Sequence, residues 1–148
     1  MPDHSLHSQL LADCHLLGEV DSGSLLLSRN RAMHWFILVP ETDSQDLLDL
    51  PAAALHRVMA DCRGLSQFLK QDLGYPKVNF AGLGNVVPQM HLHLIGRREG
   101  DACWPQPVWG RLEDAGAWPP GDLLALTEGL TIRAGLRPSA DPQPGPKA

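Results

Sequence analysis

The chain has 148 residues, a hydrophobic fraction of 43% and a formal net charge of −5 at pH 7. This length fits one domain with a single sizeable core. The acidic balance argues against non-specific nucleic-acid binding, which needs a basic surface, but it allows a small phosphorylated ligand. The three cysteines form no Cys-x-x-Cys pair, and no apolar run is long enough to span a membrane. We therefore expect a cytoplasmic protein with neither a membrane nor a nucleic acid as partner.

The N-terminal part is predicted to form a three-stranded meander. Residues 6–17 mix apolar and polar positions, which favours a short helix leading into a strand at residues 15–20. The turn cluster Asp21-Ser22-Gly23-Ser24 separates this strand from residues 25–28, which predicts a hairpin. The apolar run Trp35-Phe36-Ile37-Leu38-Val39 is typical of a central strand buried on both faces.

The longest predicted helix begins at Pro51 and ends before Gly74. Proline is well tolerated at the first helical position, and glycine commonly follows the last one. Apolar residues recur at three- and four-residue spacing and form a single stripe: Leu55, Val58, Met59, Cys62, Leu65, Leu69 and Leu73. A helix of about 22 residues, rising about 1.5 Å per residue, is long enough to cross a whole sheet.

The rest of the chain completes one domain. Further strands are predicted at residues 77–83 and 90–97, and a last short helix at residues 123–132. With the meander and the long helix they give an α+β domain of residues 1–137. Residues 138–148 are rich in proline and lack large apolar side chains, so we expect a disordered tail there.

The candidate site lies in the segment Gln89-Met90-His91-Leu92-His93-Leu94-Ile95. In a strand, Gln89, His91 and His93 project to one face, and the apolar residues between them project to the other. A neutral imidazole is a good nucleophile near pH 7. The preceding loop contains Gly84 and Asn85, and glycine allows backbone N–H groups to approach an anion closely. The pattern therefore predicts an anion beside two imidazoles.

These residues resemble the histidine triad (HIT) family of nucleotide hydrolases and transferases, whose signature is His-φ-His-φ-His-φ-φ, with φ apolar. Asn79 fits the upstream Asn of the family, and Gly84-Asn85-Val86-Val87 fits its Gly-Gln-Ser/Thr-Val loop in a modified form. Gln89 replaces the first histidine, as in bacterial HIT-like proteins that resemble this chain in the segments WFILVP and CWPQPVWG. The resemblance covers roughly residues 11–132. It implies a five-stranded antiparallel sheet with one long helix across it, a short C-terminal helix and a homodimer.

The resemblance also implies a role for each site residue. His91 takes the place of the nucleophile that attacks the α-phosphorus of a nucleotide and forms a nucleotidyl-histidine, which water then hydrolyses. His93 takes the place of the histidine that binds phosphate oxygens. The substrate-binding positions fall on Asn79, Gly84, Asn85 and Val87. Neither a cofactor nor a resident metal is implied, although a nucleotide substrate can carry Mg²⁺.

Gln89 is counted among the catalytic positions, but it departs from the family. In the family the backbone carbonyl of this residue holds the nucleophile's other ring nitrogen, so a side-chain change leaves the orientation of His91 intact. Glutamine cannot deliver a proton, and loss of a general acid typically costs about 10²–10⁴-fold in rate. The cost is smaller when the leaving group is a weak base. We therefore expect dinucleoside polyphosphates, as in diadenosine tetraphosphate hydrolases, to be turned over better than nucleoside phosphoramidates.

Other interpretations of the histidine pair stay open. A nucleotide-binding module with weak or no catalysis would keep the same pocket. A His-x-His pair can also bind a metal, but no histidine follows His93, and the nearest following carboxylate is the distant Glu99. The pair can also be no more than a polar sheet face.

Several neighbouring residues carry weaker expectations. His34 is out of register with the family's Gly-His by one residue and is expected to point to the other face. Trp35 can flank a base, although a core position is favoured. Arg97 and Arg98 either supply a positive field to the site or are solvated charges. The loop between Trp104 and Trp109 is expected to pack on the core, to line the pocket or to serve the dimer.

Overall fold

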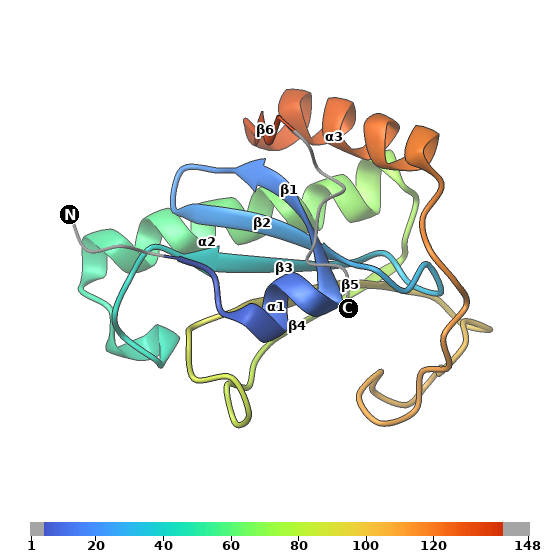
Figure 1. Cartoon of the computed structure of the whole chain (residues 1–148), viewed down its shortest axis with the longest axis horizontal. Helices are drawn as coiled ribbons and strands as arrows, with labels where there is room; N and C mark the ends of the chain where they lie inside the picture. Colours follow the sequence, from blue (N-terminus) through green and yellow to red (C-terminus); the bar gives the residue numbers. More distant parts are fainter. Residues whose placement is uncertain (1–4, 141–148) are drawn as a thin grey trace.

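The computed structural model describes residues 5–140, which form one antiparallel sheet with helices on both faces (Figure 1). In chain order the elements are α1 (Ser8–Asp13), β1 (Cys14–Glu19), β2 (Gly23–Ser28), β3 (Trp35–Pro40), α2 (Ala52–Gln67), β4 (Lys77–Gly82), β5 (Leu92–Arg97), α3 (Pro120–Ala134) and β6 (Arg137–Pro138). Within these residues no helix has the length and apolar character needed to cross a bilayer.

The sheet has six strands in the order β4-β5-β3-β2-β1-β6. The expected five strands are all present, so the prediction was wrong only in missing β6. This strand consists of Arg137–Pro138 and pairs with Gly18 and Glu19 of β1. Two polar or proline positions cannot show the period-two alternation that identifies a strand. The sheet thus extends to Pro138, and residues 141–148 of the expected tail lie outside the described part of the chain.

The apolar run of β3 is buried on both faces, as its composition predicted. Phe36 and Leu38 belong to the main core on the face covered by α2 and α3, which we call the α2/α3 face. Ile37 and Val39 pack with Leu10 of α1 on the opposite face, which we call the α1 face. A central strand with apolar residues at consecutive positions thus serves two cores at once.

Helix α2 crosses the α2/α3 face, and α3 packs beside it (Figure 1). Val58, Cys62 and Leu65 of α2 are buried, and the helix continues as a π-helical turn through Phe68–Asp72. Gly129 of α3 allows a close approach here, because a Cβ at this position would lie 2.7 Å from the Phe68 ring. The predicted long helix is therefore present in two segments, with Gly74 just beyond it at φ +81°.

Two segments cover the α1 face. The first, residues 5–13, contains α1 and is called the N-terminal arm. The second, residues 101–118, contains no helix or strand and is called the C-terminal strap. Val108 and Trp109 of the strap pack against Ile95 of β5 and against Met33, which precedes β3. The arm and the strap leave the central part of this face open, and the candidate site lies there.

Candidate active site

A cavity of about 780 Å³ lies on the α1 face of the sheet. Its floor includes Trp35 and Ile37 of β3 and both candidate histidines, His91 and His93. Its walls come from the N-terminal arm, the loop before β5 and the C-terminal strap. A volume of this size is in the range of small-molecule sites. The cavity therefore brings together the two imidazoles that the sequence pattern singled out.

His91 lies directly before β5 and is partly exposed to the cavity. Its Nδ1 lies 2.7 Å from the backbone carbonyl oxygen of Gln89. A carbonyl can only accept a hydrogen bond, so Nδ1 carries the proton and Nε2 of the neutral ring holds the lone pair. This is the arrangement that the resemblance implied, and it leaves His91 with a nucleophilic nitrogen.

His93 lies on β5 and has the opposite tautomer. The indole Nε1 of Trp35 donates to its Nδ1 at 3.0 Å, and an indole N–H can only donate. In the neutral ring the proton is therefore on Nε2. Burial, together with the nearby His91, lowers the pKa of His93 to about 4, so the ring is neutral at physiological pH. His93 thus offers an N–H donor beside His91, whose ring centroid is 5.1 Å away.

Two tryptophan rings, those of Trp35 and Trp109, lie around the His93 ring. The ring of Trp109, from the C-terminal strap, stands edge-on to His93 at 5.1 Å between centroids and to Trp35 at 5.9 Å. Trp109 and Trp35 both line the cavity. Two of the expected alternatives for the tryptophan loop therefore hold for Trp109, which packs on the core and also lines the pocket, while a role in a dimer stays a prediction. Trp104 instead lies near Arg97, with the guanidinium carbon 5.7 Å from its ring centroid.

The glycine-containing loop also borders the cavity. Gly84, Asn85 and Val87 line it, as the sequence predicted for substrate-binding positions. Gly84 has φ +69°, a left-handed conformation that favours glycine. Val87 is buried, whereas Val86, which also lines the cavity, is 89% exposed. The loop is thus anchored at Val87 and exposed to solvent at the residue before it.

The described residues that line the cavity include more acidic than basic side chains. Among the described residues, Arg29 is the single Lys or Arg of the lining, and Asp13 and Asp114 also line it. The Arg29 guanidinium already donates to the backbone oxygens of Leu11 and Ala12. The Nε2–H of His93 and the backbone N–H groups of the loop are therefore donors available for an anion, whereas the His91 N–H is already bonded to the Gln89 carbonyl.

The Gln89 side chain lies on the same face of the sheet as the imidazoles, as the alternation predicted, but it does not line the cavity. Met90 packs in the core of the α2/α3 face, whereas Gln89 contacts the arm on the α1 face. The Gln89 amide bonds to this arm at Ser5 and His7. Its carbonyl, in contrast, has the predicted contact with His91.

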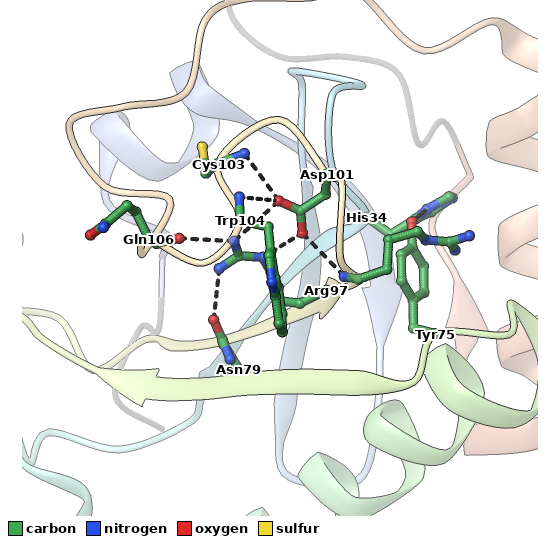
Figure 2. A network of polar contacts seen from close by, with 9 residues as sticks. His34, Tyr75, Asn79, Arg97, Asp101, Cys103, Trp104 and Gln106 are labelled. Atoms are coloured by element: carbon green, nitrogen blue, oxygen red, sulfur yellow. Dashed lines mark hydrogen bonds and ion pairs between the residues drawn. The ribbon is translucent and has the colours of Figure 1, made fainter.

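Asn79 is also engaged away from the cavity. It lies on β4 opposite Ile95, and its Oδ1 accepts a hydrogen bond from Arg97 at 2.8 Å. Figure 2 shows this amide, the Asp101 carboxylate and the Gln106 backbone oxygen around the guanidinium. The lining of the cavity does not include Asn79. The contact with sugar or phosphate that the resemblance implies for Asn79 stays a prediction.

Arg97 has neither of the two roles considered for it. It is 1% exposed and forms a buried ion pair with Asp101 at 2.8 Å. Although burial opposes ionisation of Asp101, hydrogen bonds from Arg97 and from backbone N–H groups of the strap lower its pKa to about 2. Arg98 packs over the Tyr75 ring at 4.3 Å. Arg97 therefore helps to hold the strap, whereas Arg98 is exposed directly after β5, in agreement with the expected solvated charge.

His34 lies outside the cavity, as its register predicted. Its Nδ1 is 2.5 Å from the hydroxyl oxygen of Tyr75, and its ring packs against Trp118. Burial, and to a smaller extent the charge of Arg98, lowers its pKa. Tyr75 and Trp118 both pack against the core on the α2/α3 face. His34 is therefore part of the packing around that core.

Two contacts that shape the site were not predicted from the sequence. Trp35 was favoured as a core residue, but it holds the tautomer of His93. Ile37 of β3 lies opposite His93, so Trp35 is a diagonal neighbour on the same face. The strand register would have shown this, and one sequence does not give the register. Lining of the pocket was one expectation for the loop of Trp109, but its contact with His93 was not predicted, because it joins an irregular segment to β5.

The described residues contain no group of three or more histidine, cysteine or acidic side chains placed to hold a metal ion. A His-x-His metal site would need a third ligand near His91 and His93. Residues 5–140 do not supply one. The arrangement of the two imidazoles is therefore better described by their hydrogen bonds.

Comparisons with known proteins agree with the geometry. The HIT domain family model matches residues 9–100. A histidine triad protein from Bradyrhizobium japonicum has a TM-score of 0.83 and 33% identity, covering 90% of this chain and 99% of its own. One from Marinobacter aquaeolei VT8 has a TM-score of 0.81 and 34% identity, covering 88% and 96%. One from Sinorhizobium meliloti 1021 has a TM-score of 0.81 and 30% identity, covering 87% and 96%.

No match is found among curated proteins. The family model nevertheless covers more than half of the chain, and the solved histidine triad proteins share its fold over nearly their whole length. The matched region includes α1 from its second residue, the loop before β5 and both imidazoles, and it ends before the C-terminal strap. The chain therefore belongs to the histidine triad family, whose members are generally nucleotide hydrolases or transferases.

Proposed function

We propose that this protein is a nucleotidyl hydrolase or transferase that cleaves its substrate at the α-phosphate through a nucleotidyl-His91 intermediate. The observation that carries the proposal is the pair of opposite tautomers in one cavity. His91 has its Nδ1 proton fixed by the Gln89 carbonyl, and His93 has its Nδ1 lone pair occupied by Trp35. One ring is thereby prepared to attack and the other to donate.

The reaction follows from these positions in two steps. Nε2 of His91 attacks the α-phosphorus and forms a P–N bond, while the bond from phosphorus to the bridging oxygen breaks and its electron pair leaves with the remaining phosphate chain. The Nε2–H of His93 donates to a non-bridging oxygen of the α-phosphate. Water then forms a P–O bond to the same phosphorus while the P–N bond breaks and its electron pair returns to Nε2 of His91. The nucleoside monophosphate leaves, the proton lost by the water passes to solvent, and His91 is again neutral with its proton on Nδ1.

The leaving group decides which substrate suits this site. Gln89 cannot protonate an oxygen or nitrogen, and its amide is bonded to the arm. His93 is held neutral, and a neutral imidazole is a poor acid. A phosphoanhydride leaving group is stable without a proton, whereas an amine is not. The proposal therefore favours dinucleoside polyphosphates over nucleoside phosphoramidates.

Phosphate charge also has to be balanced in a wall that contains few free cationic groups. The one lining arginine, among the residues described, is bonded to the arm. Backbone N–H groups of the glycine-containing loop and the His93 N–H can donate hydrogen bonds to the oxygens of the α-phosphate. The more distant phosphates fit best as a complex with Mg²⁺ brought by the substrate, since Asp13 and Asp114 would repel uncomplexed polyphosphate.

A nucleotide-binding module with weak or no catalysis is the second candidate. The observation that favours it is the position of the Gln89 amide, which leaves no titratable first triad residue at the cavity. Such a protein would retain the apolar walls that can pack a base. The two candidates share a ligand class and differ in whether a covalent bond to His91 forms.

The decisive experiment uses radiolabelled diadenosine tetraphosphate. Rapid acid-free denaturation should trap nucleotide on the protein, and brief acid treatment should release it, because a phosphohistidine-type P–N bond is acid-labile. His91→Ala should abolish both the label and the turnover while binding of the nucleotide persists. His56→Ala, an exposed histidine on α2, is the matched control and should keep the label.

Each outcome separates the candidates. Label on wild type that disappears in His91→Ala supports the enzyme. Equal affinity in both proteins without any label supports the binding module. Faster turnover of an adenosine phosphoramidate than of the dinucleoside polyphosphate would contradict the preference for a weakly basic leaving group.

A further inference from the structure

The Gln89 side chain is bonded to the N-terminal arm through both of its polar atoms. Its Oε1 accepts from the backbone N–H of His7 at 2.8 Å, and its Nε2 donates to the backbone oxygen of Ser5 at 3.2 Å. The His7 N–H and the Ser5 carbonyl belong to alternate residues of the arm. The Gln89 amide therefore bonds to the same pair of backbone groups that a neighbouring β-strand would use. The contact joins positions 84 residues apart in the chain.

The arm needs such contacts because its helix is short. Helix α1 has six residues, and an isolated helix of this length is not stable in water. At its start the His7 side chain accepts from the Gln9 N–H, and at its end Arg29 donates to Leu11 and Ala12. The arm is thus held by the buried Leu10, by Arg29 and by Gln89.

The arm is also a wall of the nucleotide cavity. Gln9, Leu10, Ala12 and Asp13 line it. Leu10 packs with Ile37 and Val87, two residues that also line the cavity. Any movement of the arm away from the sheet therefore widens the cavity and removes contacts from a bound ligand.

Gln89 connects this wall to the nucleophile. Its side chain holds the arm, and its carbonyl oxygen accepts from Nδ1 of His91. A change of side chain leaves the carbonyl in place. The two functions of the residue are therefore separable by substitution, with arm contacts in the side chain and imidazole orientation in the main chain.

We propose that Gln89 is a positioning residue that latches the N-terminal arm over the cavity and so sets the affinity for the nucleotide. The glutamine in place of the first triad histidine then has a structural role. Its side chain holds the arm that lines the cavity, and it cannot act as a proton donor. The part of this inference that concerns affinity rests on the proposed function. The part that concerns the arm does not.

The first test measures hydrogen exchange in the ligand-free protein. Gln89→Met keeps the length of the side chain and removes both hydrogen bonds. Backbone amides of residues 7–12 should exchange roughly tenfold faster, the equivalent of one to two net hydrogen bonds. Strand β2 should be unaffected, which shows that the variant is folded. Unchanged exchange in the arm would overturn the latch, and Gln45→Met, at an exposed loop position, is the matched control.

The second test separates affinity from chemistry with diadenosine tetraphosphate as the substrate. In Gln89→Met, KM should rise by roughly 5- to 150-fold, the range that two net hydrogen bonds can supply, while kcat stays within about twofold. The reason is that the carbonyl contact with His91 survives. A fall in kcat of about 100-fold or more with an unchanged KM would show that the side chain acts on the reacting atoms, and the proposal would fail.

The third test asks whether position 89 can reach the leaving group. Gln89→His restores the family's histidine. If the side chain faces the arm, turnover of an adenosine phosphoramidate should not rise above the wild-type rate. A tenfold rise would overturn the inference. If no variant binds or turns over nucleotides, the proposed function fails, and the exchange measurement alone decides whether Gln89 is a latch.

Discussion

His91 and His93 differ in what each of them can do because their Nδ1 atoms meet partners of opposite character. One faces a carbonyl oxygen and the other an indole N–H. The tautomers are fixed by these neighbours, since a neutral imidazole donates from one nitrogen and accepts at the other. The first contact is a main-chain contact that tolerates any residue at position 89. The second depends on Trp35 alone.

Trp35→Phe tests the second contact. The variant keeps an aromatic ring and removes the indole N–H, so the proton of His93 can occupy either nitrogen. We expect a fall in kcat of about 2- to 12-fold, the equivalent of one net hydrogen bond of about 0.5–1.5 kcal/mol. Nitrogen NMR of the labelled imidazole should show the Nδ1-unprotonated form of His93 in wild type and a mixture in the variant.

Trp118→Phe is the matched control for this prediction. The Trp118 indole donates to the backbone oxygen of Ser28 at 2.8 Å, so the same kind of hydrogen bond is lost. The His93 tautomer should not change. A single unprotonated-Nδ1 form of His93 in Trp35→Phe would show that another group sets the tautomer.

The low pKa of His93 predicts how stability depends on pH. Its ordinary value is 6.5, and burial followed by the effect of His91 lowers it to about 4 in the folded state. Between these values the unfolded chain binds a proton that the folded protein does not, so stability contributed by neutral His93 is present above about pH 6.5 and is lost as the pH falls toward 4.

His93→Gln removes this titration. The difference in free energy of unfolding between wild type and variant should therefore shift against wild type when urea denaturation is moved from pH 7 to pH 4.5. Contributions from the other carboxylates and histidines largely cancel in this difference. A difference that is the same at both pH values would contradict a buried, neutral His93.

At residue scale, the sequence predicted the local contacts of the site but not the contacts between residues far apart in the chain. The His91 contact with the Gln89 carbonyl was expected from the family resemblance, and because it involves the main chain it does not depend on the side chain at position 89. The contacts of the Gln89 amide, Asn79 and Trp35 were not predicted. Their partners lie 18 to 84 residues away, and no local period encodes such a distance.

At the scale of elements, the C-terminal strap has no regular structure and is held by polar contacts at two places. Arg97 and Asp101 fix its beginning, and Asn30 fixes its end through the backbone of Glu113 and Ala115. Between these points Trp109 contacts His93. Regular helices and strands were predicted with small errors at their ends, because burial follows their periods. The strap and β6 have no such period, so their paths were not predictable.

Asp101→Asn tests the first of these attachments. The Arg97 guanidinium would remain buried without its counter-ion, and breaking a buried pair by removing one partner typically costs about 3–5 kcal/mol. We expect a loss of stability of this order in urea denaturation at pH 7. The pKa of Asp101 is lowered from 3.8 to about 2, so the stability it contributes is present above about pH 4 and is lost as the pH falls toward 2.

Asp43→Asn, at an exposed position, is the control for the loss of one negative charge and should change stability by less than about 0.5 kcal/mol. The difference between Asp101→Asn and wild type should shrink below pH 4. If Asp101→Asn cost no more than the control, the ion pair would not hold the strap.

At the scale of the whole molecule, β4 is one edge of the sheet, and its free side presents unpaired backbone groups. Six residues make it a longer edge than the two-residue β6 at the other side. Phe80 of β4 is 43% exposed, and Leu83 directly after it is 46% exposed. An exposed strand edge with large apolar residues is a site where a second chain can add its own strand.

We therefore expect two copies to pair through β4 about a two-fold axis and form the homodimer that the family resemblance implies. Phe80→Glu places a negative charge at this edge, and the two-fold axis brings the same charge from the second copy near it. The repulsion should prevent pairing, so the variant should sediment as a monomer at concentrations where the wild type sediments with twice the chain mass. Met59→Glu, on α2 with 41% exposure, is the matched control and should remain dimeric. Because β4 pairs with β5 next to His93, loss of the dimer should also weaken protection of β5 in hydrogen exchange. A wild type that sediments as a monomer, or a Phe80→Glu variant that stays dimeric, would exclude this edge as the interface.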